Sequence, residues 1–158
     1  MLKRWALLLT LCAVVAPLQA SDSIPDTFGR LPVLSGGRVK PVDSVARTAL
    51  LMMRGKQSVR FEGKTISASE WLLDMVFRPA RADGYPVFQI DDPDVLGLMG
   101  MEQGKKRYFS FADLKNNLAM IDTQGVQAGA IKAPKRDRFQ RSIVTLRQRL
   151  ILYQKLQN

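Results

Sequence analysis

The sequence has no histidine and only one cysteine, Cys12, in 158 residues. Histidine is the usual general base near neutral pH and the commonest ligand of transition metals and haem iron, so its absence removes the ordinary catalytic systems and metal sites. Because Cys12 lies in an N-terminal apolar run, the rest of the chain has no thiol for a disulfide or a redox reaction. We therefore expect no enzymatic activity, no catalytic residues, and no metal or cofactor bound directly by this chain.

Long apolar runs are also scarce. The one that stands out covers residues 5–16, and it follows Lys3 and Arg4 and precedes the sequence Pro-Leu-Gln-Ala. A membrane-spanning helix needs roughly 20 apolar residues, whereas this shorter layout is typical of a secretory signal. The sequence predicts a signal peptide over residues 1–20. The mature protein is then expected to be periplasmic or otherwise extracytoplasmic, and soluble or peripheral at the membrane.

Glycine and aspartate patterns exclude two further kinds of site. The glycines lack the spacing of a phosphate-binding loop. Asp91, Asp92 and Asp94 are close together, but the glycine and the glutamate that a calcium-binding EF-hand loop requires are missing from their expected places. We interpret these aspartates as the start of a helix, since Pro93 lies among them.

What the chain does have is positive charge, with a formal net charge of +10. Such a surface favours anionic lipid headgroups, an acidic partner or carboxylates such as those of haem. No nucleic acid partner is expected, because an exported protein seldom meets one.

The most specific stretch covers residues 31–56. An apolar segment at 31–34 precedes a turn that contains Gly37, and Pro41 keeps the chain extended before a helix begins. Asp43 is predicted to be the N-cap of that helix. The stretch therefore predicts a hairpin followed by a helix that Gly55 ends.

Three basic residues, Arg38, Lys40 and Arg47, lie close to the start of this helix in the sequence. Positive charge there opposes the helix dipole, so folding alone does not explain it. We take the three residues as the candidate binding patch.

The following segments alternate between hairpins and helices. Residues 59–66 read as a second hairpin, and Ser67 with Glu70 predicts the capped start of a helix that runs to residue 77. Trp71 in that helix is interpreted as a core anchor, with haem stacking or partner binding as the alternative. Short strands near residues 86–90 and 107–109 and a helix from residue 111 to 121 complete the expected core.

The predicted fold is a small single α+β domain, in which short strands and hairpins pack with four to five helices. Its expected parts are a flexible lead-in at 21–27, a core domain at 28–122 and a flexible linker at 123–134. A long basic amphipathic helix follows at 135–158, where apolar residues repeat every three or four positions. This helix is expected to pack on its own domain, with a partner or the membrane surface as the alternative.

Three segments together resemble a known family. They read FGRLPVLSGGRVKPVDSVARTALLMMRGK, SEWLLDMVFRP and PVFQIDDPDVLGLMG, and the resemblance runs from about residue 28 to about residue 98. In this order and spacing they resemble the extracytoplasmic domain of system II (Ccs-type) cytochrome c biogenesis proteins. These proteins move haem across the membrane and attach it to apocytochromes, using histidine ligands and a tryptophan-rich loop for which this chain has no matching residues.

The resemblance implies an exported, non-catalytic accessory module of cytochrome c maturation. Its expected partners are an integral membrane cytochrome c synthase component or apocytochrome c, and haem would be reached only through such a partner. One alternative is a periplasmic haem- or anion-binding protein that uses Arg38, Lys40 and Arg47 for carboxylates. Another is a truncated descendant without maturation activity.

Overall fold

The computed structural model describes residues 23–104 and 106–157, so the predicted signal peptide lies outside the described residues. The helices are α1 (Ile24–Arg30), α2 (Val42–Arg54), α3 (Ala68–Phe77), α4 (Pro79–Ala82), α5 (Pro93–Leu98), α6 (Phe111–Leu114), α7 (Leu118–Ala130) and α8 (Arg138–Gln157), with 3-10 turns η1 (Lys115–Asn117) and η2 (Ala133–Lys135). The strands are β1 (Pro32–Ser35), β2 (Arg38–Pro41), β3 (Val59–Phe61), β4 (Lys64–Ile66), β5 (Phe88–Gln89) and β6 (Tyr108–Phe109).

The strands form three separate antiparallel pairs, β1 with β2, β3 with β4, and β5 with β6. Pairs this small bury little apolar area, so the helices supply most of the core. The result is a small α+β domain that ends in a long helix, which confirms the predicted fold class.

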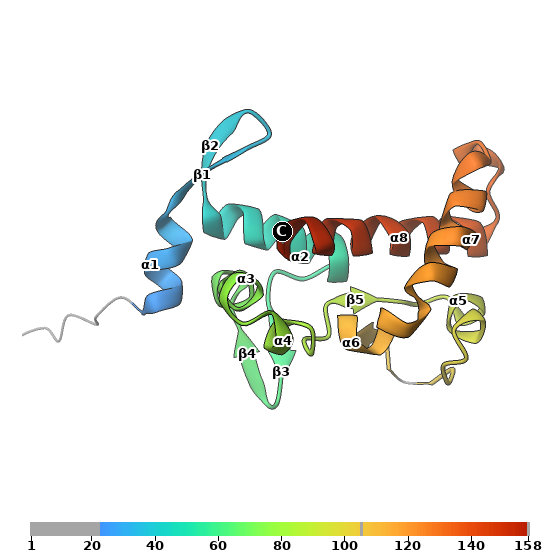
Figure 1. Ribbon diagram of the computed structural model, residues 1–158, viewed down its shortest axis with the longest axis horizontal. Helices are drawn as coiled ribbons and strands as arrows, with labels where there is room; N and C mark the ends of the chain where they lie inside the picture. The colour runs from blue at the N-terminus through green and yellow to red at the C-terminus, as the bar shows by residue number, and fades with distance from the viewer. Residues whose placement is uncertain (1–22, 105, 158) are drawn as a thin grey trace, which may run out of the picture.

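The β1–β2 hairpin turns at Gly36 and Gly37, whose φ angles are +60° and +75°. Two residues with positive φ form the kind of tight turn that matches the twist of the flanking strands, as the glycine pair predicts. In Figure 1 this hairpin projects away from the helices, above α2.

Helix α2 begins two residues earlier than expected. Pro41 occupies the N-cap position and makes no side-chain cap hydrogen bond, so the prediction of Asp43 as the N-cap is wrong. Asp43 instead lies in the first turn of α2, where its charge still favours the helix dipole. Its side chain is used elsewhere, because Ser69 of α3 donates a hydrogen bond of 2.8 Å to its Oδ1 atom.

Two segments predicted to be flexible are helical. Within the lead-in at 21–27, helix α1 begins at Ile24, because the Ser23 side chain caps the Asp26 amide and Pro25 suits the first turn. Within the linker at 123–134, helix α7 continues to Ala130. Both predictions are corrected here, and the helical part of each belongs to the folded domain.

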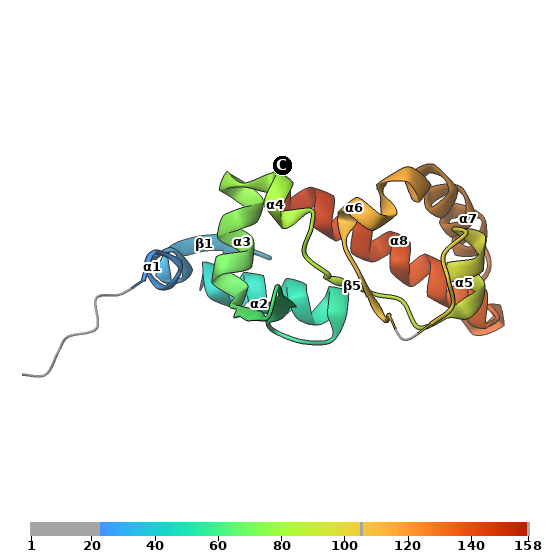
Figure 2. The same cartoon turned by 90° about the horizontal axis from the view of Figure 1, so that it is seen from below.

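Helix α8 runs along much of the molecule and contacts α7, α5, α3 and α2. Figure 2 shows it crossing from the group formed by α5 and α7 to the group formed by α2 and α3. Its buried residues keep the predicted spacing: Ile143, Leu146, Leu150 and Tyr153. This face packs on the domain itself, as the leading interpretation of the sequence held.

Helix α3 begins and ends close to the predicted positions, since the Ser67 side chain accepts from the Glu70 amide and the helix ends at Phe77. Trp71 lies on its inner face and is fully buried. In the described part of the chain, no helix is long and apolar enough to cross a bilayer.

Candidate binding surface

The β1–β2 hairpin carries an apolar pair of side chains that nothing covers in the described chain. Leu34 and Val39 are register partners, so both side chains leave the same face of the hairpin. Each is 73% exposed. Pro32 and Pro41 pair on the same face two positions away, and both are exposed. We call this four-residue surface the apolar face of the arm.

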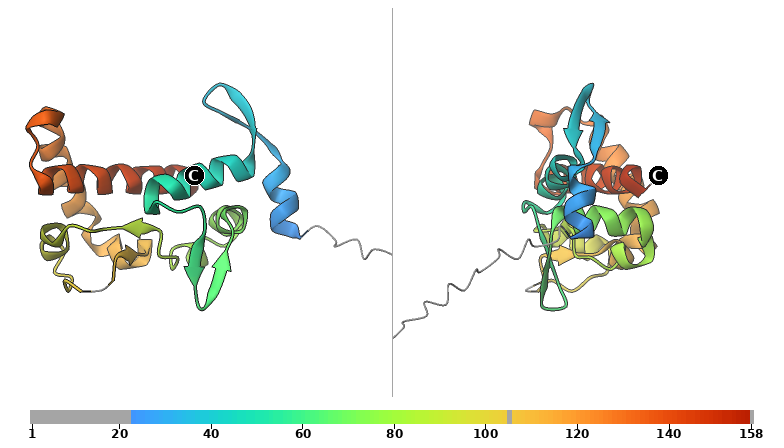
Figure 3. Two further views of the ribbon diagram at one scale, coloured as in Figure 1. Left: turned by 180° about the vertical axis from the view of Figure 1, so that it is seen from behind. Right: turned by 90° about the vertical axis from the view of Figure 1, so that its left-hand side faces the viewer.

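The opposite face of the hairpin is polar and basic. Its register pairs are Val33 with Lys40 and Ser35 with Arg38. Arg38 and Lys40 are exposed, and they place two positive charges on the side of the arm opposite the apolar face. Figure 3 shows from two further directions that the arm extends beyond the group of helices, with its base next to the start of α2.

A groove of about 400 Å³ lies at the foot of the arm, between α2 and the last turns of α8. Lys40 and Ser35 of the arm line one side of it. Its apolar lining comes from Met52 of α2 and from Leu152 and Leu156 of α8. The polar face of the arm therefore borders a groove that combines apolar side chains with the charge of Lys40, while the apolar face of the arm points away from it.

Arg47 is not part of this surface. Its Nε atom lies 2.5 Å from Oδ2 of Asp43, one turn earlier on α2. With Asp43 and Ser69 it lines a second hollow, whereas Lys40 lines the groove at the foot of the arm. The structure therefore brings Arg38 and Lys40 together on the arm and pairs Arg47 with Asp43 within α2.

Gly29 shows how tightly the helices meet at that contact. A Cβ atom at this position would lie 2.5 Å from the Ser69 Oγ atom and 3.3 Å from the Asp43 Cβ atom. Since Ser69 bonds to Asp43, the glycine lets α1 pack against both α2 and α3. Gly29, Asp43 and Ser69, all within the segments that resemble the Ccs-type family, thus have a structural reason in this fold.

The buried carboxylate Asp74 is the other charged group that needs an explanation. Its Oδ1 atom lies 2.6 Å from Arg78 Nη2, and the Tyr85 hydroxyl donates a hydrogen bond to Oδ2. Burial, and then this hydrogen bond, raises the pKa of Tyr85 to about 12. The pair holds the end of α3 to the following loop, and the described residues contain no cluster of acidic side chains that could hold a metal ion.

The sequence interpretation did not single out Leu34 and Val39 as exposed residues, because apolar residues in a short strand are usually buried. A signal was present nonetheless. Once Gly36 and Gly37 are taken as a two-residue turn, the register places both prolines and both aliphatic residues on one face of a two-stranded hairpin. Whether the body of the protein covers that face depends on the direction in which the arm leaves α2, which only the fold decides.

No protein-family model matches this chain, and no curated protein sequence matches it either.

Proposed function

We propose that this chain is an exported, non-catalytic accessory module of cytochrome c maturation of the Ccs type. It binds the extracytoplasmic part of an integral membrane synthase component through the arm formed by β1 and β2. The three sequence segments that resemble the Ccs-type extracytoplasmic domain support the family assignment. The exposed apolar face of the arm supports a role in binding.

The observation that carries this proposal is the exposure of Leu34 and Val39. Two large aliphatic side chains at 73% exposure, on a hairpin that projects from the molecule, gain nothing for the isolated domain. Exposed apolar surface with a polar rim is typical of a protein–protein interface. Arg38 and Lys40, on the other face of the same arm, add positively charged surface.

The hairpin also offers a way for its partner to bind. In the described chain β1 pairs only with β2, so each strand has one edge whose backbone groups are free for another strand. An extended segment of the synthase can add to such an edge through backbone hydrogen bonds, while its apolar side chains cover Leu34 and Val39. Acidic residues in that segment would complement Arg38 and Lys40.

The test compares two identical substitutions at exposed valines. Val39→Asp places a carboxylate on the apolar face of the arm, and Val126→Asp places one on α7, where Val126 is 52% exposed. In pull-downs from membranes with the mature protein as bait, Val39→Asp is expected to reduce recovery of an integral membrane partner about tenfold, while Val126→Asp leaves recovery unchanged.

Equal recovery with both variants would exclude the arm as the binding surface. Recovery of no integral membrane protein by the unmodified bait would contradict the proposal itself. If immobilised apocytochrome c binds the bait and Val39→Asp abolishes that binding, apocytochrome is the partner in place of the synthase.

A further inference from the structure

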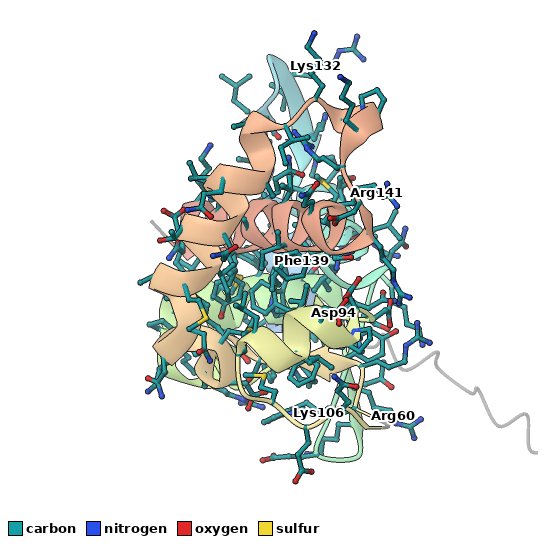
Figure 4. The ribbon with its side chains drawn as sticks, turned by 90° about the vertical axis from the view of Figure 1, so that its right-hand side faces the viewer. Arg60, Asp94, Lys106, Lys132, Phe139 and Arg141 are labelled. Carbon is teal, nitrogen blue, oxygen red and sulfur yellow. The ribbon has the colours of Figure 1, made fainter. Side chains whose placement is uncertain are left out.

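A second basic surface lies far from the arm in the sequence, on the first half of α8. Arg141, Thr145 and Arg149 are spaced by four residues and so form one row along the helix. This row lines a hollow of about 240 Å³, whose other wall is the segment from Gln89 to Asp92. In Figure 4, Arg141 lies on the same side of the molecule as Asp94 at the start of α5.

The two carboxylates in this hollow already have partners. Asp92 is buried and accepts hydrogen bonds from Ser142 and from the Asp94 amide, and its Oδ2 atom lies 3.1 Å from Arg138 Nε. Asp91 accepts from the Arg107 Nε atom at 2.6 Å and also from the side chain of Gln89. The acidic groups are therefore neutralised without either arginine of the row.

Arg141 and Arg149 differ from Arg138 in this respect. Neither forms an ion pair with a carboxylate anywhere in residues 23–104 or 106–157. Arg141 donates only to the backbone carbonyl of Arg136, and its side chain is otherwise exposed. The hollow thus contains two guanidinium groups that have no carboxylate ion pair in the described chain, although the charge of Asp91 acts on Arg149 and offsets part of the effect of burial on its pKa.

Arg149 is also held rigidly in place. Its Nε atom donates to the carbonyl of Met52 at 3.1 Å, and its Nη1 atom donates to the carbonyl of Gln89. These bonds leave the Nη2 end of the guanidinium without a hydrogen bond to the described chain. Burial lowers the pKa of Arg149, which means that its charge is only partly solvated. A bound anion stabilises the charge of a partly desolvated cation. A side chain that is already fixed in place loses little conformational entropy when it binds that anion.

From this geometry we propose that the hollow binds a phosphate group between Arg141 and Arg149, either as free phosphate or as the headgroup of an anionic phospholipid. Guanidinium groups match the oxygens of phosphate with paired N–H donors. The volume of the hollow is below the roughly 300 to 1,000 Å³ of pockets that hold drug-sized ligands, so it suits one such group and not a large cofactor. This site is independent of the arm and of the proposed function.

The experiment titrates the full chain with inorganic phosphate and follows the Nε–H signals of its arginines by nuclear magnetic resonance. We expect saturable shifts of the Arg149 and Arg141 signals. Arg141→Gln is expected to weaken binding about tenfold, since it removes one charge-assisted contact. Arg149→Lys keeps the charge but loses the planar fork, and a similar loss is expected.

The matched control is Arg60→Gln, which removes one positive charge from an exposed residue of β3, outside the hollow. A parallel experiment measures binding to phosphatidylglycerol vesicles and to phosphatidylcholine vesicles. If Arg141→Gln weakens the binding of free phosphate and Arg60→Gln does not, the result supports a free ligand. The same pattern with phosphatidylglycerol vesicles alone supports a lipid headgroup. Equal effects of Arg141→Gln and Arg60→Gln, or no saturable response to either probe, would overturn the proposal.

Discussion

Asp74 shows how single residues stabilise this domain. Its carboxylate is fully buried, yet it follows Trp71 on a helix whose other face is in solvent. An isolated buried charge costs several kcal/mol, so its partners decide whether the fold tolerates it. Arg78 lies one turn later on the chain, and the Tyr85 hydroxyl approaches from the loop after α4. Local sequence supplies the first partner and the fold supplies the second.

Removing this carboxylate is expected to be costly. Asp74→Ala leaves the buried Tyr85 hydroxyl without its acceptor and opens space beside it, so the free energy of unfolding should fall by about 3 kcal/mol. Urea denaturation measures the change. Asp122→Ala is the control, because Asp122 forms an exposed pair with Arg147 and its loss should cost less than about 1 kcal/mol. Similar losses in the two variants would contradict this account.

The raised pKa of Tyr85 also predicts a dependence of stability on pH. The phenol binds its proton more tightly in the folded protein, with a pKa of about 12, than at its ordinary value of 10.0. Its contribution is complete below about pH 10 and is lost as the pH rises towards about 12. Denaturation midpoints should therefore fall more steeply over this window in the unmodified protein than in Tyr85→Phe. Parallel curves for the two proteins would rule out the effect.

At the level of elements, the contact between α7 and α8 explains why residues 123–130 are ordered. A Cβ atom at Gly125 would lie 2.5 Å from Arg147 Cδ and 2.9 Å from Arg147 Cβ, so the glycine lets the two helices approach closely. At the end of α7, the Arg136 side chain donates hydrogen bonds to three backbone carbonyls: those of Ala128, Gly129 and Ile131. In the sequence these glycines suggest flexibility. In the structure they allow close packing and lie in a helix whose end is capped.

Two identical substitutions in α7 test this explanation. Gly129→Ala meets open space and should raise the free energy of unfolding by about 0.5 to 1 kcal/mol, since alanine favours a helix over glycine. Gly125→Ala gains the same propensity but must push Arg147 away, and we expect a net loss of about 1 kcal/mol. Thermal unfolding followed by circular dichroism measures both. A gain in both variants would mean that the helices do not need the glycine.

The sequence predicted elements best where one short segment contains the whole cause. The paired glycines gave the first hairpin, and Ser67, Asp92 and Ser110 each cap the helix that follows them. The two segments predicted to be flexible depend on more distant residues. Helix α1 packs on α3 through Gly29, and α7 packs along α8. Neither contact can be inferred from the composition of the segment itself.

On the scale of the whole molecule, α8 joins elements that are distant in sequence. Its Tyr153 hydroxyl donates to Asp83 at 2.8 Å, and its Arg149 side chain reaches the end of α2 and strand β5. Burial of Ile143, Leu146 and Leu150 along one face adds a continuous apolar contact. The C-terminal helix is therefore part of the folding unit, and we expect the domain to unfold as a whole.

Trp71 provides a fluorescence probe of unfolding, because it is the only tryptophan after residue 20 and is fully buried on the inner face of α3. In the chain without residues 1–20, its fluorescence and the far-ultraviolet circular dichroism of all helices should follow one coincident urea transition. Leu146→Ala in α8 should shift both signals equally, with a loss of about 2 to 5 kcal/mol. The exposed residue Leu51 is the control, and Leu51→Ala should cost less than about 0.5 kcal/mol. Separate transitions for the two signals would show that α8 unfolds independently.

For the candidate sites, as for the fold, some features follow from the sequence alone and others only from the tertiary structure. The sequence alone determines the absence of histidine, the basic charge, the turn at Gly36 and Gly37, and the helix caps, since each depends on composition or on a few neighbouring residues. Only the tertiary structure decides that Leu34 and Val39 remain exposed and that Arg149 faces Gln89 across 60 positions of sequence. Packing decides these because burial and long-range contacts depend on how the elements are oriented, and that orientation is a property of the complete core.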